Sequence, residues 1–295
     1  LNYQGKTRDV MTLAHELGHG VHQVLAGPQG QLMADTPLTL ADTASVDVAG
    51  LAVPGVIDVG PGASLHAEQV DIQNALPITA GSYTATTTRI LGTGIVVNSD
   101  VTLDMPRLEI PVGPGRLEIR DATVTLTGDF AQDISQGTRG LNFAHTGARF
   151  EVGGDVVLGA QESHNSNYFN NGVFTIGGDL TIDCAVGILC LYSGGTDFVL
   201  DGSGAQSVML PASSQYYLRS LEVAPGAAVT LQTDSFWRSD VTVRGSLNNL
   251  SGRTARAGRD LVLDGGTLLN GGTFEYDGAF TNVGGSVSGN APVNY

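Results

Sequence analysis

The stretch Gly154-Asp155-Val156-Val157-Leu158 shows the local pattern that decides the fold of this chain. A glycine or polar residue precedes an aspartate, and a short run of the form apolar-x-apolar follows. Asp129, Asp155 and Asp179 are 26 and 24 residues apart. A return after about 20–26 residues is typical of one coil of a β-solenoid. The other copies are Ser99-Asp100-Val101-Thr102-Leu103, Gly178-Asp179-Leu180-Thr181-Ile182, Ser239-Asp240-Val241-Thr242-Val243, Arg259-Asp260-Leu261-Val262-Leu263 and the weaker Gly128-Asp129-Phe130.

Low charge and abundant glycine favour the same fold class. Glycine accounts for 41 of 295 residues, charged residues for 15% and hydrophobic residues for 41%. This composition suits strands joined by tight turns and does not suit a disordered tail. We therefore expect a mainly β protein, in which residues 47–295 form a right-handed parallel β-solenoid of roughly ten coils. A β-sandwich is the alternative, because strands every 8–12 residues or about that would suit it as well.

The first part of the chain has a different periodicity. Apolar residues recur at three- and four-residue spacing through residues 7–26, which predicts one amphipathic helix. A second, shorter helix is expected at about residues 37–46, because Thr36-Pro37 is a typical helix start. We therefore divide the chain into a helical segment, residues 1–46, and a glycine-rich repeat domain, residues 47–295, in which we expect no helix.

The helical segment carries one motif with specific chemistry, His15-Glu16-Leu17-Gly18-His19. Two histidines four residues apart project from one face of a helix and can bind one Zn²⁺ through their imidazoles. Glu16 follows the first histidine, where a carboxylate can take a proton from a zinc-bound water. The motif therefore predicts a zinc metallopeptidase centre, with His15 and His19 as metal ligands and Glu16 as the general base.

The sequence from Gly5 to His22 closely resembles the oligoendopeptidase F branch of the thimet-type oligopeptidases. The likeness continues through Thr36-Pro37-Leu38-Thr39-Leu40-Ala41 and ends at Val46, so it covers only the helical segment. By this resemblance, the zinc site would act on short peptides, and His22 would support the metal ligands without binding the metal.

The family's third zinc ligand is a glutamate that aligns with Asp42, and here the sequence departs from the family pattern. Aspartate is one methylene shorter, so its carboxylate would fall about 1–1.5 Å short, whereas zinc sites tolerate about 0.2 Å in bond length. The helical body that forms the family's peptide channel has no counterpart in this sequence, nor do the family's downstream tyrosine and histidine. We therefore expect a fragment of a peptidase centre with little or no turnover.

Three interpretations of this fragment stay open. A truncated piece of peptidase sequence joined to a solenoid near Val46 would produce the pattern. So would a genuine fusion that binds zinc without efficient turnover, and so would an active peptidase.

Residues 47–295 resemble, by composition, bacterial surface and adhesin-like solenoids. This predicts the alternative function, a cell-surface structural or adhesive repeat protein with a glycan or protein ligand and no enzymatic role. The two resemblances imply different compartments, cytoplasmic for the peptidase branch and exported for the solenoid. A net charge of −15 argues against nucleic-acid binding. The sequence contains no uninterrupted apolar run of about 18 residues, so it predicts no membrane span.

The two cysteines, Cys184 and Cys190, leave two possibilities. They are either buried thiols or, in an exported protein, partners in a short-loop disulfide. The corner aspartates could bind Ca²⁺, but the glycine-rich pattern of calcium solenoids is missing. The residues expected to have structural roles are His66, His145, His164, the core residue Trp237, and Asn165–Asn171 as a polar loop or an asparagine ladder at a coil corner.

Overall fold

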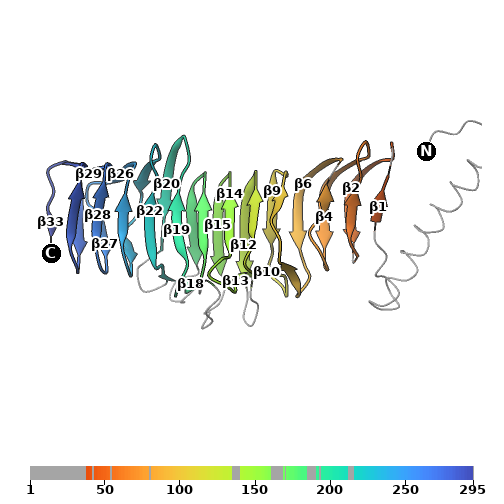
Figure 1. Cartoon of the computed structure of the whole chain (residues 1–295), viewed down its shortest axis with the longest axis horizontal. Coiled ribbons are helices and arrows are strands. Elements are labelled where there is room, and N and C mark those ends of the chain that lie inside the picture. The colour runs from red at the N-terminus through yellow and green to blue at the C-terminus, as the bar shows by residue number, and fades with distance from the viewer. Residues whose placement is uncertain are drawn as a thin grey trace, which may run out of the picture.

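Parallel strands follow one another at short, regular intervals and wind into stacked coils (Figure 1). The computed structural model describes residues 38–294, apart from 42, 54, 80, 135–139, 161–168, 170, 185–190, 193 and 212–215. Within these residues the secondary structure consists of strands and turns, with no helix. The predicted β-solenoid is therefore confirmed, and the expected helix at residues 7–26 lies outside the described residues.

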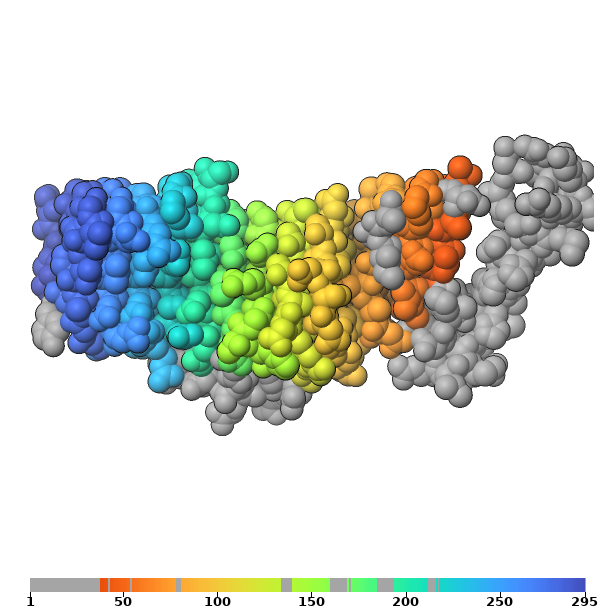
Figure 2. Space-filling view, viewed as in Figure 1, coloured from red at the N-terminus to blue at the C-terminus, as the bar shows by residue number. Residues whose placement is uncertain are grey.

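Twelve strands form the longest sheet, which we call the long face. Each strand belongs to the next coil along the axis, so 11 spacings of ~4.8 Å give a column about 53 Å long (Figure 2). Its strands, in spatial order, are β2 (Ser45–Val53), β4 (Ser64–Ile72), β6 (Ser82–Ile90), β9 (Arg107–Ile110), β12 (Asp129–Ile134), β15 (Val156–Ala160), β17 (Leu180–Cys184), β20 (Ala205–Met209), β23 (Ala228–Leu231), β26 (Ser246–Asn249), β29 (Thr267–Asn270) and β32 (Ser286–Ser288).

Two further faces complete the coils. The second face is a nine-stranded sheet of β8 (Val101–Leu103), β11 (Thr123–Leu126), β14 (Arg149–Val152), β16 (Val173–Ile176), β19 (Asp197–Leu200), β22 (Ser220–Val223), β25 (Val241–Val243), β28 (Leu261–Asp264) and β31 (Phe280–Val283). The third face consists of four short sheets: β1 (Leu38–Leu40), β3 (Ile57–Val59) and β5 (Ile78–Thr79); β7 (Ile95–Val97), β10 (Arg116–Ile119) and β13 (Gly140–Phe143); β18 (Leu191–Tyr192) and β21 (Tyr216–Tyr217); and β24 (Ser235–Trp237), β27 (Thr254–Ala257), β30 (Thr273–Tyr276) and β33 (Val293–Asn294).

The strand pairs are parallel and in register on all three faces, which excludes the sandwich alternative with its antiparallel sheets. The coil length varies along the column. Ala228 pairs with Ser246, 18 residues later, whereas Leu180 pairs with Val208, 28 residues later. The repeat is therefore less regular in length than the aspartate spacing predicts.

The expected helix at residues 37–46 is wrong. Leu38–Leu40 and Ser45–Val53 are strands of the first coil, so the solenoid already includes residues that we assigned to the helical segment. Leu38 pairs with Ile57 and Leu40 with Val59. Pairing with the next coil decides the conformation here, because local helix propensity is a weak preference that tertiary contacts override.

Apolar side chains fill the inside of the column. Strands such as Arg149–Val152 and Val173–Ile176 alternate half-exposed and buried residues, as a sheet with one solvated face requires. Phe150, Phe174 and Phe198 stack on successive coils, with ring centroids 5.3 and 5.7 Å apart. Trp237 lies fully buried, 6.4 Å from the ring of Phe198, and its predicted place in the core is confirmed.

Candidate binding groove on the long face

The residues predicted to form a zinc centre, His15, Glu16, His19, His22 and Asp42, all lie outside the described residues. Their zinc-binding and catalytic roles therefore stay predictions. In the described part of the chain, no group of three or more histidine, cysteine, aspartate or glutamate side chains is placed to hold a metal ion. The same part holds no helix long and apolar enough to cross a membrane.

The described column does have a groove of about 820 Å³ on the outer surface of the long face. It crosses four successive strands, β9, β12, β15 and β17. Because the strands are parallel and in register, outward side chains of neighbouring coils form straight columns along its floor. The residues that line the groove are Arg107, Glu109, Ile110, Pro111, Val112, Ala131, Gln132, Asp133, Val157, Gly159 and Asp183.

The floor of the groove is apolar on one side. Glu109, Ala131, Val157 and Thr181 are register partners on consecutive strands, so Ala131 and Val157 lie side by side in the middle. Val112 at the rim is 48% exposed, which is unusual for a large aliphatic side chain. This part of the groove can therefore accept an aliphatic chain.

The other side of the floor is acidic and has a hollow. Asp133, Gly159 and Asp183 are register partners on β12, β15 and β17. Gly159 has no side chain, and a Cβ atom there would lie 3.1 Å from the carbonyl oxygen of Gln132 and 3.5 Å from Oδ1 of Asp133. The third neighbouring atom is the Asp183 carbonyl oxygen at 3.6 Å, so two backbone carbonyls and the Asp133 carboxylate surround the hollow, and a single methyl group would partly fill it.

Among the described residues that line the groove, the cationic side chain is Arg107, and it has an anionic partner. Arg107 Nε donates a hydrogen bond to Glu109 Oε1 at 2.5 Å, and both side chains are partly exposed. Asp133 and Asp183 are two further acidic side chains among the described residues that line the groove.

A second polar cluster, around Glu118 on the third face, has a different character. Glu118 accepts hydrogen bonds from Arg116, from Arg120 at 2.6 Å and from Asn142 at 3.3 Å. Burial raises the pKa of the Glu118 carboxyl, but the hydrogen bond from Arg120 and the charge of Arg116 outweigh this and hold the pKa below its usual value. A carboxylate that is ionised and multiply bonded in this way suits a structural role, not proton transfer.

The predicted structural residues have separate local partners. His66 Nδ1 lies 2.8 Å from Thr84 Oγ1, and His145 Nδ1 lies 2.8 Å from Asp121 Oδ2, so each ring links two neighbouring coils. Asn171 donates to the Ala144 carbonyl at 3.3 Å, whereas His164 and most of the 165–171 run lie outside the described residues. An asparagine ladder is present elsewhere, inside the column, where Asn249 Nδ2 donates to Asn270 Oδ1 at 2.9 Å.

Cys184, at the end of β17, is disulfide-bonded. Cys190 is the only other cysteine in the sequence and lies outside the described residues. Of the two possibilities left open by the sequence, the disulfide is therefore the one that the structure has.

Comparisons of the chain with protein-family models, with curated proteins and with solved structures find no match. The function therefore has to be argued from the column and its groove. Sequence reasoning missed the groove, because its residues come from four coils and lie far apart along the chain. A local feature of the sequence that points to the groove is Gly159. It is a glycine at an outward strand position, where the neighbouring coils carry a side chain.

Proposed function

We propose that this protein is an exported structural repeat protein that binds a ligand on the outer surface of its solenoid. The observation that carries the proposal is the uninterrupted column of parallel coils with an apolar interior. Because the interior is filled, a ligand can reach the solenoid only from outside. A groove across four coils of one flat face supplies such a surface.

The disulfide at Cys184 supports the exported location. Disulfides persist in oxidising compartments and are rare in the reducing cytosol. The acidic composition, with 29 acidic against 14 basic residues, is consistent with a surface that stays soluble and is repelled by nucleic acid.

An array of immobilised glycans and peptides, probed with the purified chain, tests the binding role. The proposal expects retention of at least one class of ligand, and loss of that retention when Val157→Glu places a charge on the groove floor. Val262→Glu, on the outer surface of the second face, is the matched control. Retention no greater than that of an unrelated acidic protein would contradict the binding role.

Zinc binding by the first part of the chain is the second candidate, and the histidine spacing of the motif supports it. His15 and His19 would hold the ion, and a zinc ion would polarise a bound water and a substrate carbonyl. Metal analysis of the purified chain should then find about one zinc per chain, lost in His15→Ala. Cleavage of a quenched peptide by the parent but not by Glu16→Gln would establish a peptidase, and metal-free, inactive protein would exclude this candidate.

A further inference from the structure

The last described coil of the column leaves apolar side chains uncovered at inward positions. Leu261 and Leu268, in the preceding coil, are fully buried. Their register partners in the last coil are Phe280 and Val287, which are 39% and 43% exposed. Among the described residues, no further strand lies on that side of β31 or β32. The apolar interior therefore ends at a surface that is partly open to solvent.

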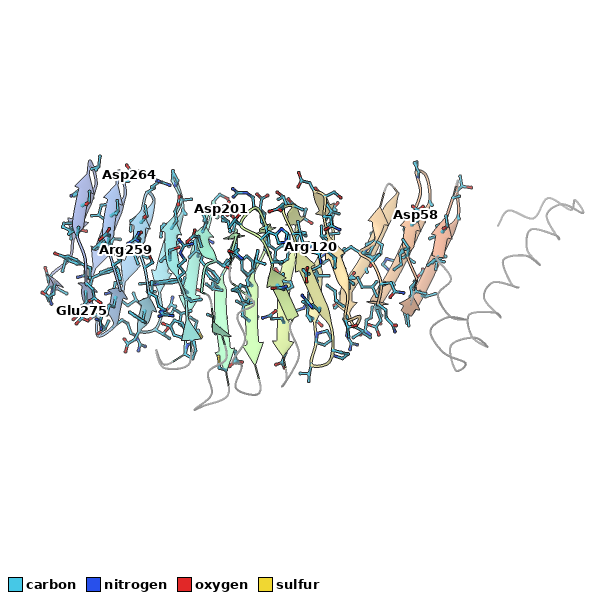
Figure 3. The ribbon with its side chains drawn as sticks, turned by 60° about the horizontal axis from the view of Figure 1, so that its bottom comes forward. Asp58, Arg120, Asp201, Arg259, Asp264 and Glu275 are labelled. Atoms are coloured by element: carbon cyan, nitrogen blue, oxygen red, sulfur yellow. The ribbon has the colours of Figure 1, made fainter. Side chains whose placement is uncertain are left out.

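This end of the column is also uncharged. Glu275, which Figure 3 shows at this end, and Asp277 are followed by residues 278–295, which contain no aspartate, glutamate, lysine, arginine or histidine. Soluble proteins usually protect the edge strands of their sheets with charged side chains or proline, and β32 (Ser286–Ser288) carries neither. Two copies of a chain with a net charge of −15 repel each other, and they do so least where both are uncharged.

The backbone of β32 has hydrogen-bonding groups at its outer edge. Ser286 N–H donates to the Gly266 carbonyl at 2.9 Å, so the backbone groups of Ser286 point back towards β29. Successive residues of a strand direct these groups to opposite sides, so the N–H and C=O of Val287 point away from β29. In the described part of the chain, β32 is the last strand of the long face on that side. Val287 can therefore pair with a strand that is added to this edge.

The sequence around Val287 indicates which strand fits this edge, because Gly285-Ser286-Val287-Ser288-Gly289 reads the same in both directions. A two-fold interface brings the same surface of two copies together, so the surface must be complementary to itself. Two such strands paired antiparallel about Val287 place the two valines opposite each other, and the valines exchange both backbone hydrogen bonds. Each Ser286 then faces Ser288 of the second copy. Hydroxyl pairs of this kind already occur between coils, since Ser286 Oγ lies 3.0 Å from Thr267 Oγ1.

We propose that the C-terminal end of the column binds the same end of a second copy of this chain, with β32 antiparallel to its counterpart. The contact joins the two twelve-stranded long faces into one sheet and makes the two apolar interiors continuous. It does not depend on the groove or on what the groove binds. Because the contact carries no charge while the two chains repel elsewhere, added salt screens the repulsion and should strengthen the dimer.

Sedimentation velocity of the whole chain over a range of protein concentrations tests the proposal. We expect a species of twice the chain mass, whose share grows with protein concentration and with added salt. Val287→Lys should weaken the dimer by about tenfold or more, because two like charges would meet at the two-fold axis. Val96→Lys makes the same change at an exposed valine of β7, far from this end, and should leave the dimer unchanged. A monomer at every concentration, or equal effects of the two variants, would overturn the proposal.

Two double variants test the antiparallel register without changing the interior, because Ser286 and Ser288 are exposed. Ser286→Arg combined with Ser288→Asp places each introduced arginine opposite an introduced aspartate of the second copy and should preserve the dimer. Ser286→Asp combined with Ser288→Asp places like charges opposite each other and should weaken the dimer by about tenfold or more. Circular dichroism checks that both double variants are folded. Equal dissociation constants for the two would contradict the proposed pairing.

A single spin label on each chain locates the contact in the dimer. Ala228 lies on β23, the fourth strand from the free edge, so its two copies would be seven strand spacings apart, about 34 Å between backbones. Ala205 lies on the fifth strand, and its two copies would be nine spacings apart, about 43 Å. Dimers joined side by side or head to tail would not give this pair of distances, and either arrangement would overturn the proposal.

Discussion

The copies of the repeat at Asp129, Asp155 and Asp179 lead into long-face strands, whereas those at Asp100, Asp240 and Asp260 lead into second-face strands. At the corner that enters the long face, aspartate and glycine have a joint role. Asp129 Oδ1 accepts the backbone N–H of Asp155 at 2.8 Å, and Asp155 Oδ1 accepts that of Asp179 at 2.8 Å. Each aspartate therefore ties its own coil to the next one. Gly154 and Gly178 lie directly against these carboxylates. A Cβ atom at either glycine would overlap the carboxylate of the preceding coil. At this corner, the glycine of one coil therefore makes room for the aspartate carboxylate of the preceding coil.

Replacing one of these glycines should destabilise the column. We expect Gly178→Ala to lower the free energy of unfolding by about 1–3 kcal/mol, because the new methyl group overlaps Asp155 and the Gly154 backbone. Gly204→Ala is the control, since a Cβ atom there meets nothing within 4 Å. Urea unfolding of both variants measures the difference, and an equal midpoint for the two would contradict the role assigned to Gly178.

A buried tyrosine should make the column sensitive to alkali. Burial raises the pKa of Tyr83 to about 12, although the hydrogen bond with Thr88 at 2.7 Å partly opposes the shift. The folded state holds this proton more tightly than the unfolded state, so the stabilisation is complete below pH 10 and is lost as the pH rises from 10 to 12. Two pKa units correspond to about 3 kcal/mol.

Tyr83→Phe removes the titrating hydroxyl and should flatten the fall in stability over that pH window. Chemical unfolding of the parent and the variant at a series of pH values measures the effect. An equally steep decline in both proteins would show that Tyr83 does not contribute to it.

At the scale of strands, aromatic side chains from successive coils pack against one another in the interior of the column. Phe174 on β16 lies within 5.3–6.4 Å, between ring centroids, of five other phenylalanine rings. Such a cluster cannot collapse easily around a missing ring, because rings from several coils line the space.

Phe174→Ala should therefore be costly, by about 3–5 kcal/mol. Phe236→Ala is the comparison, because Phe236 points outward on β24 under the guanidinium of Arg256, which lies 5.6 Å from its ring centroid. That change should cost clearly less. Guanidinium chloride unfolding ranks the two variants, and a cost for Phe236→Ala as large as that for Phe174→Ala would contradict this account of the core.

The strands also show where sequence reasoning succeeds and where it stops. The aspartate repeat predicts the stacked coils, because corner and strand lie within five consecutive residues such as Gly154–Leu158. Residues 38–46 could not be assigned in this way, since their conformation depends on pairing with the next coil. The groove could not be predicted either, because Asp133 and Asp183 are brought together by coil lengths that the repeat does not specify.

At the scale of the whole molecule, charged side chains add cross-links between coils. Arg244 bonds Glu222 of the preceding coil and, at 3.0 Å, Asp264 of the following coil. Arg259 donates to Asp240 at 2.7 Å, and Figure 3 shows Arg259 and Asp264 towards the C-terminal end of the column. Exposed pairs of this kind contribute little individually, about 0–1 kcal/mol. The column is therefore held mainly by its backbone ladders and its apolar interior, and the ion pairs help to fix the register.

The central claim is that successive coils stack in parallel at a constant spacing along one axis. Spin labels on the long face test this directly, with Ser286 as the fixed position and Ala228, Ala205 or Ser82 as its partner, three, four and nine strands away. Labelling without reductant leaves the native disulfide closed.

We predict backbone separations of about 14, 19 and 43 Å, which rise in proportion to the number of coils. A distance from Ser286 to Ser82 no greater than that from Ser286 to Ala205 would mean that the chain folds back on itself, and the solenoid with its lateral groove would then be wrong.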